Sequence, residues 1–526
     1  VSVVATATCL ILAYPTAYLI VAASTRVRMV LIVLVLIPYL TSGLARTYAW
    51  VVILGGKGLI NNLLLQLGLI SSPLSLIYNR FAVYIGMVHI MLPVMILPLV
   101  STMQGIDKSL MSAARSMGAR PFAAFWRVFF PLSLPGVRSG SLLVFVICLG
   151  FYVTPAALGG LSDAMLSTFI EGQVENSFNV AQIATSAFIL LGIAGIVLLV
   201  FGLDLSGKQG LSSQPVRRYW LGGRQPLGVL TRNVSQLTAP YRARRWMTQL
   251  NQGGGNTVSW TPAGATFVVF VMAFLLFPEL VVITMSFSGG AFLEFPPSGF
   301  SLQWYRSFFD DPSWIAALAT SLQIGIAVTI VSTIVGTLAA YGLSRTFPRV
   351  RGVLTMFILT PITFPVIVVG VAIYLALLKL GLIGTNVGVV LAHSIGSIAF
   401  VVVVVSATLA NFDRRLEQAA KSMRAGPLQT FTRVTLPLIR PGIVGASVLA
   451  FLHSFDEVVV TSLVNGFSIY TLPLKMWQNI RNQIDPTIAA VASLLTLLPV
   501  LWLIVLYVTF WRSRPGRQRS LSNPLT

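Results

Sequence analysis

Two adjacent acidic residues, Asp456 and Glu457, lie inside a long apolar stretch of the sequence. An ionised carboxylate inside a membrane costs a few kcal/mol even on lenient scales, so such a residue needs a partner or a function. No Lys or Arg stands out as an intramembrane partner, and a cationic ligand would be a natural counterion. Phe455 adjoins the pair, and Phe151 and Tyr152 stand at the matching place of an earlier stretch. Aromatic ring faces attract ammonium groups, so this combination predicts a pathway for small organic cations such as polyamines.

A structural role for the same carboxylates is the competing interpretation. Asp456 would cap a broken helix or bond to His453, while one carboxyl of the pair stays protonated. Glu279 follows Pro278 in another apolar stretch, nearer its outer end, and there the structural role is favoured. The histidines lack metal-ligand spacing, so we predict no metal site and expect hydrogen bonds between helices; they are His89, His393 and His453.

The composition indicates that membrane-spanning helices position these residues. Of 526 residues, 56% are hydrophobic and only 9% are charged, and the mean hydropathy is +0.85. A soluble protein of this size needs far more charge to cover its surface. The apolar runs are continuous and about 20 residues long, so we predict an all-α integral membrane protein with about 11 transmembrane helices. The predicted spans are residues 1–22, 28–50, 82–104, 137–159, 181–203, 263–288, 314–345, 350–378, 386–410, 441–463 and 487–511.

The basic residues are distributed unevenly between the two sides of these spans. The net charge is +21, and 28 of the 35 Lys and Arg residues lie on the side that carries the loops 105–136 and 411–440. By the positive-inside rule this side is cytoplasmic. The charge therefore reports topology, and nucleic acid is not an expected partner. The remaining basic residues are expected at or near the other face: Arg46, Lys57, Arg80, Arg306, Lys379, Lys475 and Arg481.

The order of the spans divides the chain into two halves, residues 1–203 and 263–511. Residues 204–262 are rich in Gly, Ser, Gln and Arg, which predicts a basic cytoplasmic linker. Its basic residues would also suit anionic membrane lipid, and residues 512–526 form a cytoplasmic tail. The second half has six predicted spans and the first has five, which favours a chain that begins downstream of its true start.

A 24-residue passage occurs twice without a gap, 306 residues apart. Residues 113–136 and 419–442 share 13 identical positions, and both copies are basic and lie between apolar runs. Ordinary positive-inside loops explain the charge but not the identities at fixed spacing. The duplication therefore predicts two matching structures on the cytoplasmic side.

Each copy predicts a short helix that ends in a tight turn. Gly118 can supply the positive φ that ends the first of these helices. Its counterpart is Arg424, and Gly426 is the residue expected to supply the second turn instead. Pro121 and Pro427 suit the first turn of a following helix. Four further prolines predict breaks before the chain re-enters the membrane: Pro131, Pro135, Pro437 and Pro441.

On these residues the passage resembles the EAA loop of permease subunits of ATP-binding-cassette (ABC) importers that use a separate solute-binding protein. In that family the short helix of the loop docks into a groove on the ATP-hydrolysing subunit. The resemblance implies an all-α, MetI-like permease of a type I ABC importer with two homologous halves. The Glu of the family pattern is replaced by Ser112 and Gln418, although Glu417 stands one position earlier. The residues that the resemblance assigns to ATPase coupling are Leu110, Ala113, Ala114, Gly118, Leu416, Ala419, Ala420 and Arg424.

The resemblance extends along most of the chain. Residues 37–200, with the sequence SGLAR at 42–46, are similar to the first permease subunit of spermidine/putrescine importers. Residues 263–511, with SFDEVVVT at 454–461, are similar to the second, so two usually separate subunits are fused here. The implied partners are two ABC ATPase subunits in the cytoplasm and a solute-binding protein outside a bacterial inner membrane. The acidic residues expected in loops that would face this binding protein are Asp163, Glu171, Glu175 and Asp485.

The sequence contains no Gly-x-x-x-x-Gly-Lys-Ser/Thr phosphate-binding loop. We therefore expect a permease that is not an enzyme and has no cofactor of its own, with ATP and Mg²⁺ on the partner ATPase. Fused permeases of the same superfamily also serve iron(III) and thiamine, so the substrate stays open. A secondary transporter, whose halves can also be repeats, is the alternative of another class.

Overall fold

The computed structural model describes residues 1–176, 179–201, 261–290, 294–297, 299–482 and 485–512. Within these ranges every regular element is a helix, apart from an isolated bridge between Ser288 and Phe300. The prediction of an all-α fold is confirmed. Almost all of the predicted linker at 204–262 lies outside the described residues, and so does the predicted tail beyond Arg512.

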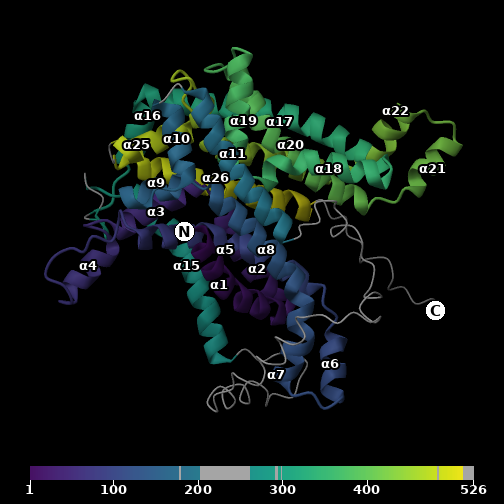
Figure 1. Cartoon of the computed structure of the whole chain (residues 1–526), viewed down its shortest axis with the longest axis horizontal. Helices are drawn as coiled ribbons and strands as arrows, with labels where there is room; N and C mark the ends of the chain where they lie inside the picture. The colour runs from purple at the N-terminus through teal and green to yellow at the C-terminus, as the bar shows by residue number, and fades with distance from the viewer. Residues whose placement is uncertain (177–178, 202–260, 291–293, 298, 483–484, 513–526) are drawn as a thin grey trace, which may run out of the picture.

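The first half runs from α1 to α11 (Figure 1). Its long helices cross the body of the molecule, and its short ones lie at the two ends. A π-helix at Phe125–Phe129 connects α7 to α8. The helices are α1 (Ser2–Ala22), α2 (Thr25–Leu40), α3 (Gly43–Leu54), α4 (Leu59–Gln66), α5 (Arg80–Gln104), α6 (Lys108–Ser116), α7 (Pro121–Ala124), α8 (Phe130–Gly150), α9 (Val153–Leu158), α10 (Leu166–Asn176) and α11 (Val180–Val200).

The second half runs from α15 to α26. A π-helix at Phe431–Thr435 connects α22 to α23, as in the first half. The helices are α15 (Pro262–Ser286), α16 (Gln303–Asp310), α17 (Pro312–Arg345), α18 (Pro348–Thr363), α19 (Val366–Lys379), α20 (Asn386–Ala410), α21 (Arg415–Ser422), α22 (Pro427–Thr430), α23 (Leu436–Phe455), α24 (Val459–Val464), α25 (Leu472–Asn482) and α26 (Thr487–Arg512).

The repeat seen in the sequence extends over most of each half. The helices α5, α8, α9 and α10 recur 306 residues later as α20, α23, α24 and α25. The helices α2 and α3 recur as α18 and α19 at an offset of 323 residues. The first half therefore has 17 additional residues between α3 and α5, a segment that includes α4 and protrudes from the body (Figure 1).

Several of the predicted membrane spans are divided between two helices. The described residues contain nine helices that are long and apolar enough to cross a membrane, and one pair, α18 and α19, that is bent by 104°. The predicted span at 28–50 is interrupted at Thr41 and Ser42, between α2 and α3. The Ser42 hydroxyl accepts a hydrogen bond from Ala45 N (3.3 Å) and so caps α3. The hydropathy averaged along the sequence stays high on both sides of such a cap. It therefore does not reveal that a new helix starts there.

The spans predicted at 137–159 and 441–463 are also interrupted, near their outer ends. The first is divided between α8 and α9, and the second between α23 and α24. By contrast, none of the four predicted proline breaks occurs: Pro131 and Pro437 lie in the first turn of a long helix directly after a π-helix, and Pro135 and Pro441 lie inside the same two helices. The π-turn shifts the hydrogen-bond register at the point where the α-helical pattern loses a donor.

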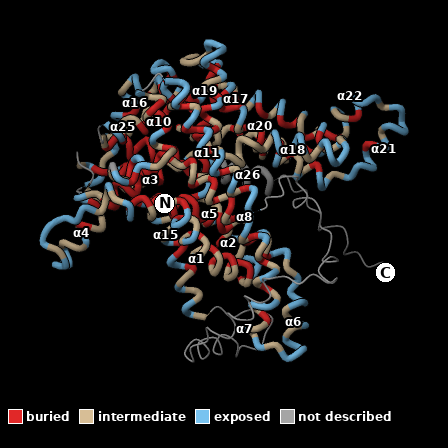
Figure 2. Tube along the Cα trace, in the orientation of Figure 1, coloured by how far each residue is buried: buried red, intermediate tan, exposed pale blue. Residues whose placement is uncertain are grey.

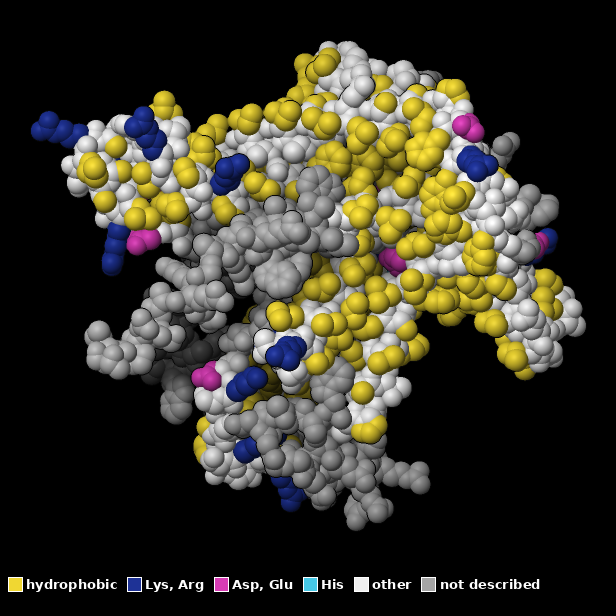
Figure 3. All heavy atoms as spheres, turned by 180° about the vertical axis from the view of Figure 1, so that it is seen from behind, with side chains coloured by type: hydrophobic (Ala, Val, Ile, Leu, Met, Phe, Trp, Pro, Cys, Tyr) yellow, Lys and Arg dark blue, Asp and Glu magenta, His cyan; other side chains and the backbone are white. Residues whose placement is uncertain are grey.

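The helices form two arms that separate from a shared, well-packed region (Figure 1). One arm ends in α6 and α7, and the other ends in α21 and α22. Buried residues concentrate where the two halves meet, whereas both arm tips are exposed (Figure 2). Hydrophobic side chains cover the surface between the ends, as Figure 3 shows. Such a surface suits contact with lipid, because lipid tails impose no penalty on exposed apolar side chains.

Candidate functional site

The break between α23 and α24 carries the two adjacent carboxylates. Asp456 follows directly after the last residue of α23. The Glu457 carboxylate accepts a hydrogen bond from Val460 N (2.9 Å), which caps the N-terminus of α24. A carboxylate at this position satisfies a free N–H of the helix and interacts favourably with its dipole. Glu457 therefore has a hydrogen-bond partner within its own half of the chain.

Asp456 has a partner in the other half of the chain. Its Oδ2 accepts a hydrogen bond from Gly43 N (3.2 Å), the first residue of α3. Its Oδ1 has no hydrogen-bond partner among the described residues. The carboxylate thus joins the end of a broken helix in one half to the start of a helix in the other half.

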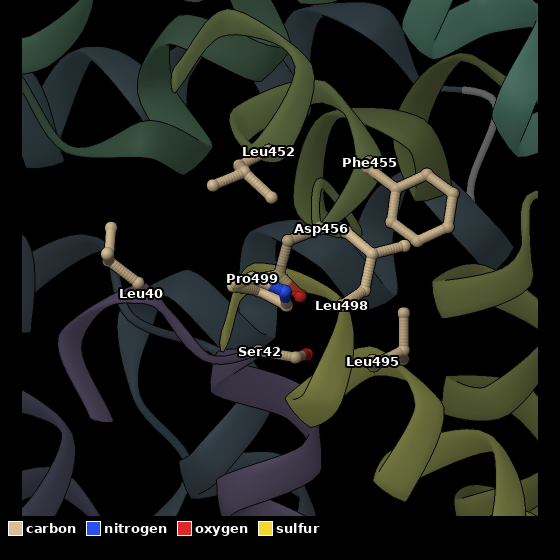
Figure 4. A pocket seen from close by; sticks show the side chains of 8 residues that line it. All are labelled: Leu40, Ser42, Leu452, Phe455, Asp456, Leu495, Leu498 and Pro499. Carbon is tan, nitrogen blue, oxygen red and sulfur yellow. The ribbon is translucent and has the colours of Figure 1, made fainter. Parts of the chain in front are cut away.

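A small cavity adjoins Asp456 (Figure 4). Its volume is about 20 Å³, which is the size that holds about one water molecule. Ser42, Phe455 and Asp456 line one part of it. Its remaining lining residues are apolar: Leu40, Leu452, Leu495, Leu498 and Pro499. The cavity is too small for an organic cation, so a substrate that reaches Asp456 requires the two halves to move apart.

The equivalent position in the first half has no carboxylate. Gly150, the last residue of α8, is the counterpart of Asp456, and it packs directly against the start of α19. A Cβ on Gly150 would lie 2.7 Å from Pro365 Cβ and 2.9 Å from Val366 N. Val366 is in turn the counterpart of Gly43. The same junction between the halves therefore occurs twice, once with a carboxylate and once with bare backbone.

A buried arginine near Asp456 was missed from the sequence. Arg46 was predicted near the outer face, but it lies in α3 and is only 6% exposed. It donates hydrogen bonds to the carbonyl oxygens of Thr41 (3.3 Å) and Ile90 (3.5 Å). It also interacts electrostatically with Glu279 and Asp456. The expectation that Asp456 has no Arg near it within the membrane is therefore wrong, because the break at Thr41 and Ser42 starts a new helix in which Arg46 is buried.

Glu279 belongs to the same buried group. It is 6% exposed, and its Oε1 accepts a hydrogen bond from the Thr41 hydroxyl (3.1 Å). Thr41 is the residue between α2 and α3, so the contact connects α15 of the second half to the break in the first half.

The aromatic residues of the predicted pathway do not share one cavity. Phe455 lines the cavity and stacks on Phe451, with ring centroids 5.4 Å apart. Tyr152 is buried and packs edge-on against Trp477 of α25 (5.5 Å). Phe151 is partly buried, and its carbonyl accepts a hydrogen bond from Ser167 (2.7 Å). Only Phe455 and Asp456 of the predicted pathway residues therefore line this cavity.

Two of the three histidines form interhelical hydrogen bonds, as predicted. The two ring nitrogens of His393 lie 2.9 Å from Ser454 Oγ and 2.9 Å from Thr461 Oγ1. His89 Nε2 lies 3.2 Å from the Leu275 carbonyl oxygen. In the described ranges, no group of three or more His, Cys, Asp or Glu residues is arranged to hold a metal ion.

On the opposite side from the arm tips, an ion-pair cluster connects the halves. Arg481 of α25 lies 3.0 Å from Glu171 and 3.1 Å from Glu175, both on α10. Burial, and secondarily the charge of Glu175, raises the pKa of Glu171 to about 8. The Arg481 guanidinium also lies over the Trp477 ring (5.7 Å).

The acidic residues expected to face a binding protein are engaged within the chain. Glu171 and Glu175 pair with Arg481 as described, and Asp163 pairs with Arg80 (2.8 Å). Asp485 accepts a hydrogen bond from Thr487 N (2.9 Å) at the start of α26. These carboxylates therefore stabilise the chain's own structure on the side opposite the arm tips.

The two short helices at the arm tips, α6 and α21, have closely matching exposure. Leu110 is 42% exposed and Leu416 is 46% exposed. Ala113 and Ala419 are exposed, and their neighbours Ala114 and Ala420 are partly covered. All six residues predicted on these two helices therefore lie together at the arm tips, with no buried residue on α6.

The turns that end these helices also match, which corrects one expectation. Gly118 has a φ of +84°, as predicted, and Arg424 has a φ of +63°. Gly426 does not supply the second turn, because its φ is −68°. Ala119 N bonds to Ala114 O and Ala425 N bonds to Ala420 O, both at 3.0 Å. These hydrogen bonds fix the left-handed residue at Arg424, although an L-residue adopts this conformation at some cost.

The second short helix has an attachment that the first lacks. Glu417 of α21 is 7% exposed, forms an ion pair with Arg345 at the end of α17, and accepts a hydrogen bond from Thr435. Its counterpart in α6 is Met111, which packs against the apolar core. Glu417 directly precedes Gln418, which replaces the Glu of the family pattern. The sequence therefore indicated an acidic residue near this position, but not its attachment to Arg345.

Two homologous sets of membrane-spanning helices, joined at broken helices and carrying matched short helices at one end, define a multi-pass permease with duplicated halves. The chain belongs to the family described as "Binding-protein-dependent transport system inner membrane component", whose model matches residues 10–208 and 332–513. It is a permease component of a binding-protein-dependent importer of the ABC class in the inner membrane, with two family domains fused in one chain.

Known relatives match this chain over part of its length. It is 34% identical over 200 residues to the spermidine/putrescine transport system permease protein PotB of Escherichia coli (strain K12), which covers 38% of this chain and 73% of PotB. It is 32% identical over 243 residues to the putrescine transport system permease protein PotI of the same strain, which covers 45% of this chain and 86% of PotI. A crystal structure of a bacterial ABC transporter involved in the import of the acidic polysaccharide alginate matches with 17% identity and a TM-score of 0.35, covering 48% of this chain and 95% of that chain.

Proposed function

We propose that this chain supplies both permease halves of an ATP-driven importer of polyamines or similar small organic cations. Two ATPase subunits would bind α6 and α21, and a solute-binding protein would deliver the substrate outside. ATP and Mg²⁺ would be held by the ATPase subunits, not by this chain.

The observation that carries the coupling proposal is the match between the two arm tips. Both short helices expose a leucine and the first alanine of an adjacent alanine pair, and both end in a turn with the same hydrogen bonds. Small exposed side chains allow a partner surface to approach the helix backbone closely. Closure of two ATPase subunits would draw the tips together and rock the halves against each other.

The cationic substrate is supported by Asp456 and by the relatives. Asp456 stands at the junction of the halves, and its Oδ1 is free of hydrogen bonds among the described residues. An ammonium group would supply the missing partner. PotB and PotI, which are named as spermidine/putrescine and putrescine permeases, are identical to this chain at about a third of the aligned residues.

Reconstitution tests the function directly. The chain is placed in proteoliposomes with its ATPase and binding protein, and ATP hydrolysis and uptake are measured with spermidine, putrescine, iron(III) and thiamine. We expect stimulation and uptake with the polyamines only. Uptake of iron(III) or thiamine instead would refute the substrate, and uptake driven by an ion gradient without the ATPase would identify a secondary transporter.

Coupling is tested separately through the attachment of α21. Glu417→Gln removes the charge that pairs with Arg345, so we expect weaker stimulation of ATP hydrolysis by substrate. Gln418→Ala changes the exposed neighbour and serves as the matched control. Equal effects of the two substitutions would contradict a specific role for the Glu417 attachment.

A further inference from the structure

Three charged side chains near the break between α2 and α3 have buried polar atoms without hydrogen-bond partners: Arg46 and Glu279 are buried, and Asp456 is half-buried. Within the described residues, Arg46 Nε, Glu279 Oε2 and Asp456 Oδ1 each lack a hydrogen bond. The three residues come from different elements: α3, α15 and the end of α23. Buried polar atoms are normally satisfied, so such a group indicates a place where a further polar partner enters.

The three charges are linked through the break between α2 and α3. Arg46 donates to the Thr41 carbonyl, the Thr41 hydroxyl donates to Glu279, and Gly43 N donates to Asp456. No salt bridge directly joins Arg46 to either carboxylate in the described part of the chain. Arg46 therefore attracts the two carboxylates electrostatically. It forms no direct contact with Glu279 Oε2 or Asp456 Oδ1, which stay without a hydrogen-bond partner among the described residues.

The positions equivalent to Arg46 and Asp456 at the other junction between the halves are uncharged. Val369 of α19 is the equivalent of Arg46, and Gly150 is the equivalent of Asp456. The equivalent junction therefore has no buried charge at either of these positions. Any electrostatic selection of a cation at the level of these junctions takes place on the Arg46 side.

We propose that Arg46 is a specificity-determining residue whose guanidinium offsets part of the negative charge of Asp456 and Glu279. This inference rests on the proposed cationic substrate. By limiting the net negative charge at the junction, Arg46 sets the preference of the pathway between organic cations of different charge. Without it, the pathway favours the more highly charged amine.

The test compares uptake of spermidine, which carries three charges at neutral pH, with uptake of putrescine, which carries two. Both are measured in the reconstituted full complex with the same binding protein, so that the specificity of the binding protein cancels between variants. For Arg46→Gln we expect the ratio of spermidine to putrescine uptake to rise roughly three- to tenfold, as expected for one additional net charge in a site of intermediate dielectric.

Three further variants separate charge from structure. Arg46→Lys keeps the charge and should keep the wild-type ratio. Val369→Gln places the same amide at the equivalent position and should leave the ratio unchanged. Glu279→Gln removes a negative charge and should lower the ratio, which provides a second readout if Arg46→Gln does not assemble.

The outcomes distinguish this inference from the proposed function. If the wild-type complex transports neither amine, the proposed function fails before any ratio is defined. If the wild-type complex transports both, and Arg46→Gln and Glu279→Gln reduce both uptakes in equal proportion, Arg46 has only a structural role and the inference is overturned.

Discussion

Glu175 and Arg481 occupy equivalent positions in the two halves, 306 residues apart, and they form an ion pair with each other (3.1 Å). A contact between two equivalent positions of a repeat lies where the halves face one another. This pair therefore reports whether the halves are closed together on the side opposite the arm tips.

A disulfide in place of this ion pair should lock the transporter. In Glu175→Cys/Arg481→Cys, oxidation should hold α10 against α25 and abolish uptake, and reduction should restore it. The native cysteines, Cys9 and Cys148, are both buried and free, so they offer no competing partner at this face. Uptake is measured before and after reduction, with each single substitution as control. Full uptake in the cross-linked state would show that these helices do not separate during transport.

The external face should close more firmly as the pH falls. The pKa of Glu171 is raised to about 8 in this conformation, chiefly by burial. Separation of α10 from α25 would solvate the carboxyl, whose pKa would return towards about 4.3. Between these values the closed state binds a proton that the open state does not, so lowering the pH favours closure and raising it through about 8 removes this preference.

Spectroscopic distances between labels on α10 and α25 check this dependence. We expect the closed population to decrease as the pH rises from about 5 to about 8 in the wild type, within the window set by the two pKa values. Glu171→Gln cannot titrate and should flatten the profile. A wild-type profile that stays flat, or one that rises with pH, would contradict the assignment.

Asp456→Asn should reduce transport more than assembly. The amide oxygen still accepts the hydrogen bond from Gly43 N, but the charge that attracts an ammonium group is lost. We expect substrate-stimulated ATP hydrolysis to fall at least about tenfold, which corresponds to a loss of about 1.4 kcal/mol, with the protein level in the membrane unchanged. Unaltered uptake by this variant would remove Asp456 from the pathway.

Gly150→Ala should weaken the other junction between the halves. The new Cβ would lie 2.7 Å from Pro365 Cβ, and neither backbone segment can yield without a shift. Overpacking of this kind costs roughly 1–3 kcal/mol. Thermal stability in detergent measures the effect, and Gly172→Ala, where a Cβ would meet nothing within 4 Å, is the control. An equal change in both variants would contradict close packing at Gly150.

Arg424→Gly should stabilise the end of α21. Glycine adopts a φ of +63° without the steric cost that an L-residue carries there. We expect a gain of roughly 1 kcal/mol, and Gly118→Arg in the equivalent turn should lose a similar amount. Local hydrogen exchange at the two arm tips checks both signs. A loss of protection in Arg424→Gly would show that the arginine side chain stabilises the turn by contacts of its own.

Much of the fold could be predicted from the sequence because its main signals are local. Long apolar runs require helices in a membrane, and the identities between residues 113–136 and 419–442 indicated two equivalent arm tips. The positive φ of Gly118 was predicted for the same reason. The matching turn at Arg424 was not, since the conformation is imposed there by the surrounding hydrogen bonds despite the residue type.

The candidate site was predicted only in part. The sequence singled out Asp456 as an unusual carboxylate, but it did not indicate the role of Arg46. Hydropathy placed residues 28–50 in one span, so the break at Thr41 and the inward turn of Arg46 were not visible. The aromatic residues were grouped by sequence, whereas Tyr152 contacts Trp477 of the other half.

The sequence by itself therefore determined the class of membrane protein and the duplication, and it predicts the side of the membrane on which the repeated helices lie. These follow from apolar length, charge distribution and residue identity along the chain. Only the tertiary structure decided which residues from the two halves meet, because each junction joins segments that are far apart in sequence. Asp456 with Gly43, Glu279 with Thr41, and Glu175 with Arg481 are pairs that no local pattern encodes, and they form only when the two halves pack together.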